Sequence, residues 1–236
     1  MKALLVRVGA DQSEGGGFWN GPVNSKTGAF AYAPIPETKP SRPNLSKPYT
    51  QIVESISKFG QTLPFHLANG HMHLDPDFAN LTYGDQGQRA IQIRSKLRGG
   101  DLIVFYAGLA DTQQSKRLVY ALIGLYVIDS IVSAAAVPEA EWDRNAHTRR
   151  FLSADANDIV VRAKANVSGR LKRCLAIGSY RNRAYRVEPD LLNEWGGLSV
   201  NDGYLQRSAR LPEFLDAARF FEWFQRQAPE LEAQNN

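Results

Sequence analysis

Cysteine is almost missing from this sequence of 236 residues, in which Cys174 is the one example. A single cysteine excludes an intramolecular disulfide and any zinc site built from several thiolates. Leucine, alanine and isoleucine follow it directly, which favours a buried structural thiol over a nucleophile. A chain without disulfides suits a reducing compartment, so we expect a cytoplasmic protein.

Long hydrophobic runs are missing as well. The longest apolar stretch, residues 118–128, is shorter than the roughly 20 residues that a membrane-spanning helix requires. The apolar run at the start is interrupted by Arg7 and lacks the cleavage pattern of a signal peptide. We therefore expect a protein with no membrane partner.

The overall composition is that of a folded globular protein. Hydrophobic residues make up 43% and charged residues 22% of the chain, which argues against disorder. The formal net charge of +4 permits a polyanionic partner without requiring one. The chain is long enough to bury a sizeable core, and no internal repeat or biased linker divides it. We expect a single domain over residues 1–236.

The apolar pattern predicts the main elements of the fold. Residues 3–8 predict a strand, and residues 100–108 and 117–131 predict a long central hairpin with two apolar faces. Helical spacing and terminal signals predict helices over residues 49–59, 87–97, 139–151 and 212–228, followed by a frayed polar tail. Together these elements indicate an α+β fold. Its sheet is expected to be twisted and mostly antiparallel, or an open barrel, with peripheral helices.

Histidines and carboxylates gather between residues 71 and 77. In an extended segment the odd positions would point to one side, and imidazole with carboxylate suits a divalent metal. The pattern predicts His73, Asp75 and Asp77 as catalytic residues, and His71, His73 and Asp75 as candidate metal ligands. The alternative is turn chemistry around the proline at position 76, with histidines that form hydrogen bonds inward.

A glycine-rich loop over residues 9–17 follows the first strand. Its amides could contact a phosphate, although close chain packing is an alternative use of the glycines. Arg89 lies in the first turn of a predicted helix, where a cation is unfavourable unless an anion lies opposite. The candidate ligand-binding residues are Asp11, Ser13, Gly15, Gly16, Trp19, Arg89, Asp101 and Tyr106.

One segment has a marked charge asymmetry. No acidic residue occurs between Ile159 and Val187, and the segment also carries two tyrosines. Basic residues interleaved with aromatics are typical of a groove for a nucleic-acid backbone. The alternative is a pair of strands whose charges are neutralised by acidic groups elsewhere. The candidate nucleic-acid contacts are Arg162, Lys164, Arg170, Lys172, Arg173, Arg181 and Arg183.

Several motifs in the first half of the chain occur in a recognisable order. They are Gly9-Ala-Asp-Gln-Ser-Glu-Gly-Gly16, Ala33-Pro-Ile-Pro36, His73-Leu-Asp-Pro-Asp77, Gly84-Asp-Gln-Gly87 and Gly100-Asp-Leu-Ile-Val-Phe-Tyr106. Over roughly residues 1–109 the chain resembles the nucleotide-modification-associated domain family, third type. The resemblance implies a role in DNA base modification in bacterial or phage systems, with partner proteins of such a system. It assigns no reaction.

Two hypotheses about function remain open. In the first, the protein is an enzyme that acts on a nucleotide or a base by acid–base chemistry or with a metal. In the second, it is a non-catalytic module that binds nucleic acid or modified bases. The strand from Gly100 and the segment Tyr120-Ala-Leu-Ile-Gly124 also resemble barrel folds of the pseudouridine-synthase-associated group, which suits the second hypothesis. A third reading is a structural partner in a modification complex.

Overall fold

A long antiparallel hairpin forms the centre of the structure, a computed structural model that describes residues 1–114, 117–205 and 210–236. Its strands are β6 (Leu102–Asp111) and β7 (Leu118–Ser133), paired from Leu102 opposite Val127 to Ala110 opposite Leu118. Almost every residue of β6 is buried, as the apolar pattern on both faces predicted. The predicted central hairpin is confirmed.

The other strands extend this hairpin into an open sheet. β1 (Ala3–Arg7) lies parallel to β6, whereas β7 pairs antiparallel with β9 (Gly169–Arg181) near its start and with β8 (Ile159–Ala163) near its end. β5 (Thr82–Asp85) continues the sheet beyond β8. The short strands at its margins are β2 (Pro22–Val23), β10 (Ala184–Val187) and β11 (Leu231–Glu232). The predicted α+β class is confirmed, and of the two expected forms the sheet is open and mostly antiparallel.

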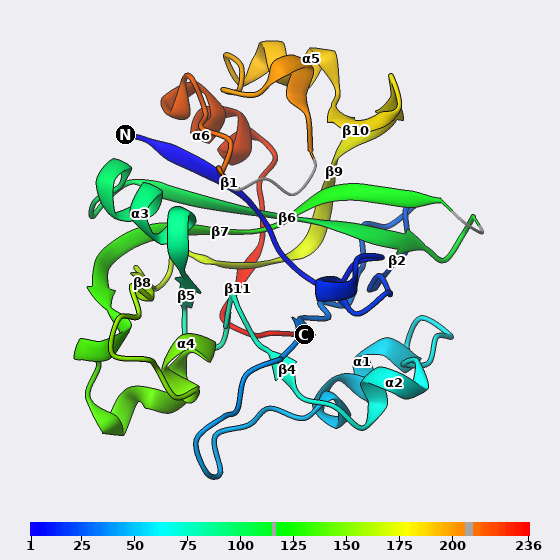
Figure 1. Ribbon diagram of the computed structural model, residues 1–236. Helices are drawn as coiled ribbons and strands as arrows, with labels where there is room; N and C mark the ends of the chain where they lie inside the picture. Colours follow the sequence, from blue (N-terminus) through cyan, green and yellow to red (C-terminus); the bar gives the residue numbers. More distant parts are fainter. Residues whose placement is uncertain (115–116, 206–209) are drawn as a thin grey trace.

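Both faces of the sheet are covered, which explains why its central strands are apolar on both sides. Leu4 and Val6 of β1 face one hydrophobic core, and Ala3 and Leu5 face a second. The second core is rich in aromatic side chains, among them Trp195, which is fully buried. Figure 1 shows α5 (Pro189–Glu194) and α6 (Ala217–Arg226) on that side of the sheet.

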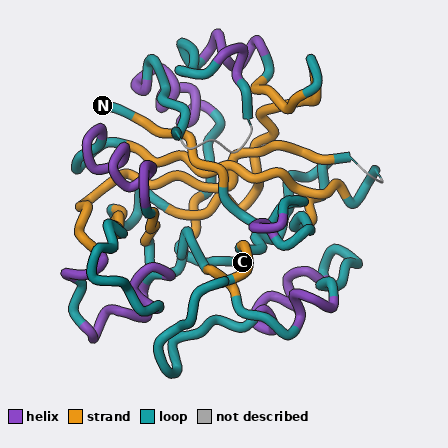
Figure 2. The backbone as a smooth tube through the Cα atoms, viewed as in Figure 1, coloured by secondary structure: helices purple, strands orange, loops and turns teal. Residues whose placement is uncertain are grey.

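The first core is covered by shorter elements and long loops, seen in Figure 2 as an extensive region of irregular chain. The helices on this side or at its margin are α1 (Val53–Ser57), α2 (Phe65–Ala68), α3 (Gly87–Lys96) and α4 (Ala146–Arg149). A separate two-stranded sheet joins β3 (Ile35–Pro36) to β4 (Met72–His73). The 3-10 helices are η1 (Glu14–Gly16), η2 (Tyr49–Ile52), η3 (Ala134–Ala136), η4 (Glu139–Arg144) and η5 (Asn201–Gly203).

Three predicted helices differ from the structure in their extent. The helix expected over residues 49–59 begins as the 3-10 helix η2 and continues as α1, which ends at Ser57. The helix expected over residues 139–151 is divided at Asn145, whose backbone is extended and whose side chain accepts a hydrogen bond from the His147 amide. Such a side chain begins a new helix, so η4 and α4 are separate elements. The helix expected from residue 212 begins only after Asp216, which caps it, because residues 212–214 run along β1 and form backbone hydrogen bonds with it.

The C-terminal tail is ordered, so the expectation of a frayed tail is wrong. β11 pairs with β9, and the side chains of Asn235 and Asn236 form hydrogen bonds with residues far away in the sequence. Asn236 accepts from the Tyr32 amide at 2.7 Å and donates to the Tyr32 carbonyl at 2.9 Å. Figure 1 shows the C-terminus in the interior of the view, near β4.

Candidate functional site

Two short segments bring the chemically active side chains together. One is the turn from His73 to Asp77, which follows β4, and the other is α4 with the residues around it. Asp77 closes the turn onto β5, because its amide donates to the Thr82 carbonyl at 2.9 Å and its carbonyl accepts from the Thr82 amide at 3.1 Å. β5 then passes beside Asp75, so that residues 73–85 form one folded unit.

His73 and His147 are the two imidazoles of the site, and each is held by a carboxylate. Nδ1 of His73 lies 2.7 Å from Oε2 of Glu37, and Nδ1 of His147 lies 2.6 Å from Oδ1 of Asp158. The two rings meet edge to face with their centroids 5.1 Å apart. A carboxylate only accepts hydrogen bonds, so the Glu37 contact places the proton of the His73 ring on Nδ1 and directs Nε2 away from Glu37. Nδ1 of His147 also lies 2.8 Å from Nη2 of Arg150, which pairs with the same Asp158 carboxylate, so its proton is assigned to Nδ1 from the shorter contact with Asp158.

Asp75 lies between the two imidazoles. Its Oδ2 is 3.9 Å from Nε2 of His73 and 3.5 Å from Nε2 of His147. The Gly84 amide donates to both of its oxygens, at 2.9 and 3.0 Å, and Nδ2 of Asn145 donates to Oδ1 at 3.2 Å. Burial raises the pKa of the Asp75 carboxyl well above its usual value, by more than these hydrogen bonds lower it.

Burial and hydrogen bonding act in opposite directions on the surrounding groups. Burial is the main cause that lowers the pKa of His147 to about 3, so this imidazole is neutral at neutral pH. Burial also raises the pKa of Glu37 and Asp158, but the hydrogen bonds and charges of their partners outweigh it. The hydrogen bond and charge of His73 lower the pKa of Glu37, and those of His147 and Arg150 lower the pKa of Asp158. Both pKa values therefore fall below the ordinary range.

Gly84 permits the close approach of β5 and α4. A Cβ atom at this position would lie 2.3 Å from Cδ2 of His147 and 2.7 Å from Oδ1 of Asn145. Both distances are far below van der Waals contact, so any larger residue would displace the histidine. Glycine is therefore required here by packing, in addition to the hydrogen bond that its amide donates.

These residues form one wall of a small pocket, hereafter the His73 pocket, with a volume of about 170 Å³. Its lining combines the imidazoles and carboxylates with three arginines, a tyrosine and backbone from the end of β1. The lining residues are Arg7, Val8, Gly9, Ile35, His73, Asp75, Tyr83, Gly84, Asp85, Gln86, Arg89, His147 and Arg150. Within this lining, the Tyr83 hydroxyl donates a hydrogen bond to Oδ2 of Asp85 at 2.5 Å.

The structure brings together only part of the predicted catalytic and metal-ligating set. His73, Asp75 and His147 each offer an atom, and these atoms lie within 4.8 Å of one another, so these three residues could hold a metal. His71 is exposed and lies outside this group. Asp77 lies outside the pocket, where it forms a buried ion pair with Arg149.

The glycine-rich loop is closed mainly by contacts within itself. Oδ1 of Asp11 accepts from the Ser13 amide at 2.9 Å, and Oγ of Ser13 accepts from the Gly16 amide at 3.1 Å. A Cβ on Gly16 would collide with Asp11, so this glycine is required by close packing. Only Gly9 of this loop lines the pocket, while Trp19 packs against the first core. Asp11, Ser13, Gly15, Gly16 and Trp19 thus lie outside the pocket lining, and a ligand contact from them stays a prediction.

The remaining predicted ligand contacts divide between the pocket and the core. Arg89 lines the His73 pocket. Asp101 is buried and accepts from the amides of Lys2 at 2.7 Å and Arg98 at 3.0 Å, which fixes the start of β6. Tyr106 belongs to the second core, on the far face of the sheet. Of the three, Arg89 is the residue that the structure places beside the two histidines.

Much of the basic segment is paired with acidic groups from other parts of the chain. Ion pairs join Arg162 to Glu141, Arg170 to Glu232, Lys172 to Glu230 and Arg181 to Asp202. Arg170 is also buried. Lys164, Arg173 and Arg183 are exposed. A nucleic-acid contact along this segment stays a prediction, and these three exposed residues are its best-placed members.

His147, Glu37 and Asp158 were not predicted from the sequence as site residues. A weak signal existed for His147, since the chain has only four histidines and this one follows an asparagine that begins a helix. No pattern marks Glu37 or Asp158, because their role depends on contacts across 36 and 11 positions of the sequence.

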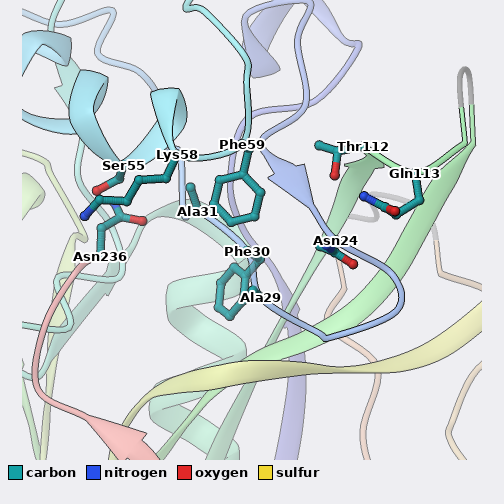
Figure 3. A pocket seen from close by; sticks show the side chains of 10 residues that line it. All are labelled: Asn24, Ala29, Phe30, Ala31, Ser55, Lys58, Phe59, Thr112, Gln113 and Asn236. Atoms are coloured by element: carbon teal, nitrogen blue, oxygen red, sulfur yellow. The ribbon is translucent and has the colours of Figure 1, made fainter.

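A larger cavity of about 490 Å³ lies elsewhere, bounded by α1, the loop after β2 and the C-terminal residue. Figure 3 shows Lys58, Ser55 and Asn236 at one end of it and Thr112 and Gln113 at the other. Lys58 is the only ionisable side chain among the described lining residues. Its lining therefore offers no set of groups for proton transfer or metal binding, and the smaller pocket is the better candidate.

No helix within the described residues is both long and apolar enough to cross a membrane. Among known families, a sequence model described as nucleotide modification associated domain 3 matches residues 2–219. The match extends well beyond the first half, where the motifs were recognised. No curated protein and no solved structure gave a match.

Proposed function

The chain belongs to the nucleotide modification associated domain 3 family, and we propose that it is an enzyme that modifies a nucleotide in the His73 pocket. The chemistry takes place at His73, Asp75 and His147. In its finer form, the proposal is that the target is a base in DNA and that the protein works in the cytoplasm of a bacterial or phage system. The family resemblance alone supports that setting.

The observation that carries the proposal is the arrangement of two imidazoles around one buried carboxylate. Burying polar and charged groups is costly unless they are fully paired. Here Glu37 and Asp158 orient the rings, and both Nε2 atoms face Oδ2 of Asp75 at the pocket wall. Groups with shifted pKa values that converge in a pocket are typical of catalytic sites.

The dimensions and charge of the pocket favour one part of a nucleotide. A volume of about 170 Å³ is below the roughly 300 Å³ at which pockets for whole drug-sized ligands begin, so it suits a base or a phosphate group. Arg7, Arg89 and Arg150 also line the pocket, where Arg7 forms an ion pair with Asp11 at 3.3 Å and Arg150 forms one with Asp158. A base within a duplex would have to leave the stack to enter such a pocket.

A second candidate function is the recognition of nucleic acid without chemistry. Its support is the exposed side chain of Tyr180 on β9, which is 65% exposed, together with exposed Arg173 and Arg183 on and beside the same hairpin. Aromatic stacking combined with phosphate contacts is a common mode of single-strand binding. In the enzyme, this surface would bind the nucleic acid and direct it toward the pocket. Partner proteins of a modification system could bind to the same surface.

The test is mass spectrometry of nucleosides. DNA, RNA and free nucleotides from bacteria that produce the parent chain, the Asp75→Ala variant or the His71→Ala variant are digested and compared. We expect a nucleoside of new mass with the parent and with His71→Ala, and none with Asp75→Ala. Purified protein given the same nucleic acids and a small-molecule extract serves as a second assay. Unchanged nucleosides in both assays would refute the enzyme.

Binding distinguishes the second candidate in the same samples. Oligonucleotide affinity that falls steeply with salt, together with unchanged nucleosides, would favour recognition without chemistry. Flat affinity from low to physiological salt would refute it.

A further inference from the structure

We propose that His73, Asp75 and His147 bind one divalent transition-metal ion at the wall of the His73 pocket. The inference deepens the proposed function, since it names a cofactor for the same site. Its meaning for catalysis rests on that function, but metal binding itself can be measured without any substrate.

The two imidazoles present acceptor nitrogens to Asp75. Each imidazole has its Nδ1 against a carboxylate, at 2.7 Å from Glu37 for His73 and 2.6 Å from Asp158 for His147. In a neutral ring with the proton on Nδ1, the other nitrogen is an acceptor. Both Nε2 atoms are then acceptors, and they lie 3.9 Å and 3.5 Å from Oδ2 of Asp75. When Asp75 is ionised, as a metal-bound carboxylate is, three acceptors converge, and a cation between them stabilises this arrangement.

The distances between these three atoms suit the coordination of one ion. Oδ2 of Asp75 lies 3.9 Å and 3.5 Å from the two Nε2 atoms, which is longer than a hydrogen bond. Two ligand atoms that are each about 2.1 Å from a metal lie about 3.4 Å apart at a tetrahedral angle. The three atoms, all within 4.8 Å of one another, are thus spaced for coordination with small adjustments.

Neighbouring residues hold the three candidate ligands in place. Histidine ligands of metals usually donate their other N–H to a carboxylate, which fixes the ring and increases its basicity. Glu37 and Asp158 do so here from two different parts of the chain. Asp75 is held in turn by the Gly84 amide and by Asn145. All three ligands are therefore oriented before any ion binds.

The donor set indicates the class of metal. Two imidazoles and one carboxylate suit Fe²⁺, Zn²⁺, Co²⁺ or Mn²⁺, whereas Mg²⁺ and Ca²⁺ prefer oxygen donors alone. Three protein ligands also leave coordination positions for a water molecule or a substrate atom, as in catalytic rather than structural sites. Arg89 and Asp85 line the same pocket.

The experiment titrates metal into chelator-treated full-length protein. Binding of Zn²⁺, Co²⁺, Mn²⁺ and, under anaerobic conditions, Fe²⁺ is measured by calorimetry and by competition with a chromophoric chelator. Mg²⁺ serves as the hard-cation comparison. We expect one ion per chain, an absorption spectrum of bound Co²⁺ that indicates nitrogen ligands, and much weaker binding of Mg²⁺.

Matched variants identify the ligands. His73→Ala and Asp75→Ala should abolish stoichiometric binding, and Glu37→Gln and Asp158→Asn should weaken it by about 10- to 100-fold. His71→Ala, two residues away and exposed, should bind like the parent. Circular dichroism monitors folding, and the Co²⁺ spectrum of the parent reports on its histidine ligands even if a buried variant does not fold.

Two results would overturn the inference. One is a folded parent chain that binds none of the four transition metals stoichiometrically. The other is an equal loss of binding in His71→Ala and His73→Ala. Metal binding without a modified nucleoside would sustain this inference and refute the proposed function. A modified nucleoside without bound metal would do the reverse.

Discussion

Asp75 and Asp77 lie two residues apart in one turn, and both are buried, with 8% and 1% of their surface exposed. Their surroundings are nevertheless opposite in character. Asp77 is surrounded by donors: Arg149 forms an ion pair with it, and Asn80 and Asn235 donate to its carboxylate. On one side, Asp75 accepts hydrogen bonds from the Gly84 amide and from Asn145. On the other side, it faces two histidine nitrogens.

The opposing segment has the same two-residue spacing. His147 and Arg149 belong to the same short helix, and the first faces Asp75 while the second faces Asp77. Two short segments therefore build two adjacent polar clusters. In the cluster around Asp77, opposite charges are paired, as in a structural anchor. In the cluster around Asp75, the carboxyl group faces two histidine nitrogens. The difference teaches that burial of an aspartate says little until its partners are known.

The largest effect on stability is expected from Asp77→Ala. It removes the buried carboxylate that pairs with the Arg149 guanidinium and leaves only the half-exposed Asp143, 3.4 Å from Nε, and breaking a buried pair typically costs about 3–5 kcal/mol. The free energy of unfolding, measured with urea, should fall by that amount. In a double-mutant cycle with Arg149→Ala the two losses should be strongly non-additive. Additive losses would show that the pair does not anchor the turn.

The different roles of Asp75 and Asp77 could not be predicted from the sequence, for a physical reason. In an extended segment, positions 73, 75 and 77 share one side, and the prediction grouped them accordingly. The chain instead folds back at Asp77 onto Thr82, which directs its carboxylate toward Arg149. The hairpin of β6 and β7 was predictable because two apolar runs separated by a short polar turn are a local signal. The selection of Asp75 was not, because it depends on His147, 72 positions away.

Gly84→Ala is expected to have the next largest effect, and it acts on the Asp75 side. Its new methyl group would overlap the His147 ring, so the structure must shift at a cost of about 1–3 kcal/mol. Because His147 moves, metal affinity should fall as well. Thermal unfolding and metal titration measure the two effects. When Gly84→Ala is introduced into His147→Ala, it should lower the free energy of unfolding by less than it does in the parent. An equal loss in the two backgrounds would contradict the proposed overlap.

Asn235→Ala tests whether the C-terminal residues support only the Asp77 cluster. The Asn235 side chain accepts from the Phe78 amide at 2.8 Å and donates to Oδ1 of Asp77 at 3.1 Å. Loss of both contacts should lower the free energy of unfolding by about 1–2 kcal/mol. Metal affinity should remain within about twofold of the parent, since no contact reaches the histidines. A large loss of affinity at unchanged stability would break the separation of the two clusters.

The smallest effect on stability is expected from Asp75→Asn, although it should abolish metal binding and modification. The amide oxygen can still accept from Gly84 and Asn145, and the new N–H groups can face the histidine nitrogens. The free energy of unfolding should therefore stay within about 1 kcal/mol of the parent. A loss as large as that of Asp77→Ala would remove the distinction between the two aspartates.

The alkylation rate of Cys174 provides an independent measure of how strongly Asp77 and Asp75 each contribute to stability. Burial raises the pKa of its thiol to about 12, whereas an exposed thiol ionises near pH 8.5. At about pH 9 the folded protein therefore keeps the thiol protonated, and alkylation requires opening of the core. Asp77→Ala should accelerate alkylation by about a hundredfold or more, as its loss of stability implies, and Asp75→Asn should leave the rate nearly unchanged. Equal acceleration by the two variants would mean that Asp75 supports the fold as Asp77 does, and the case for a ligand-binding role would then rest on the histidines alone.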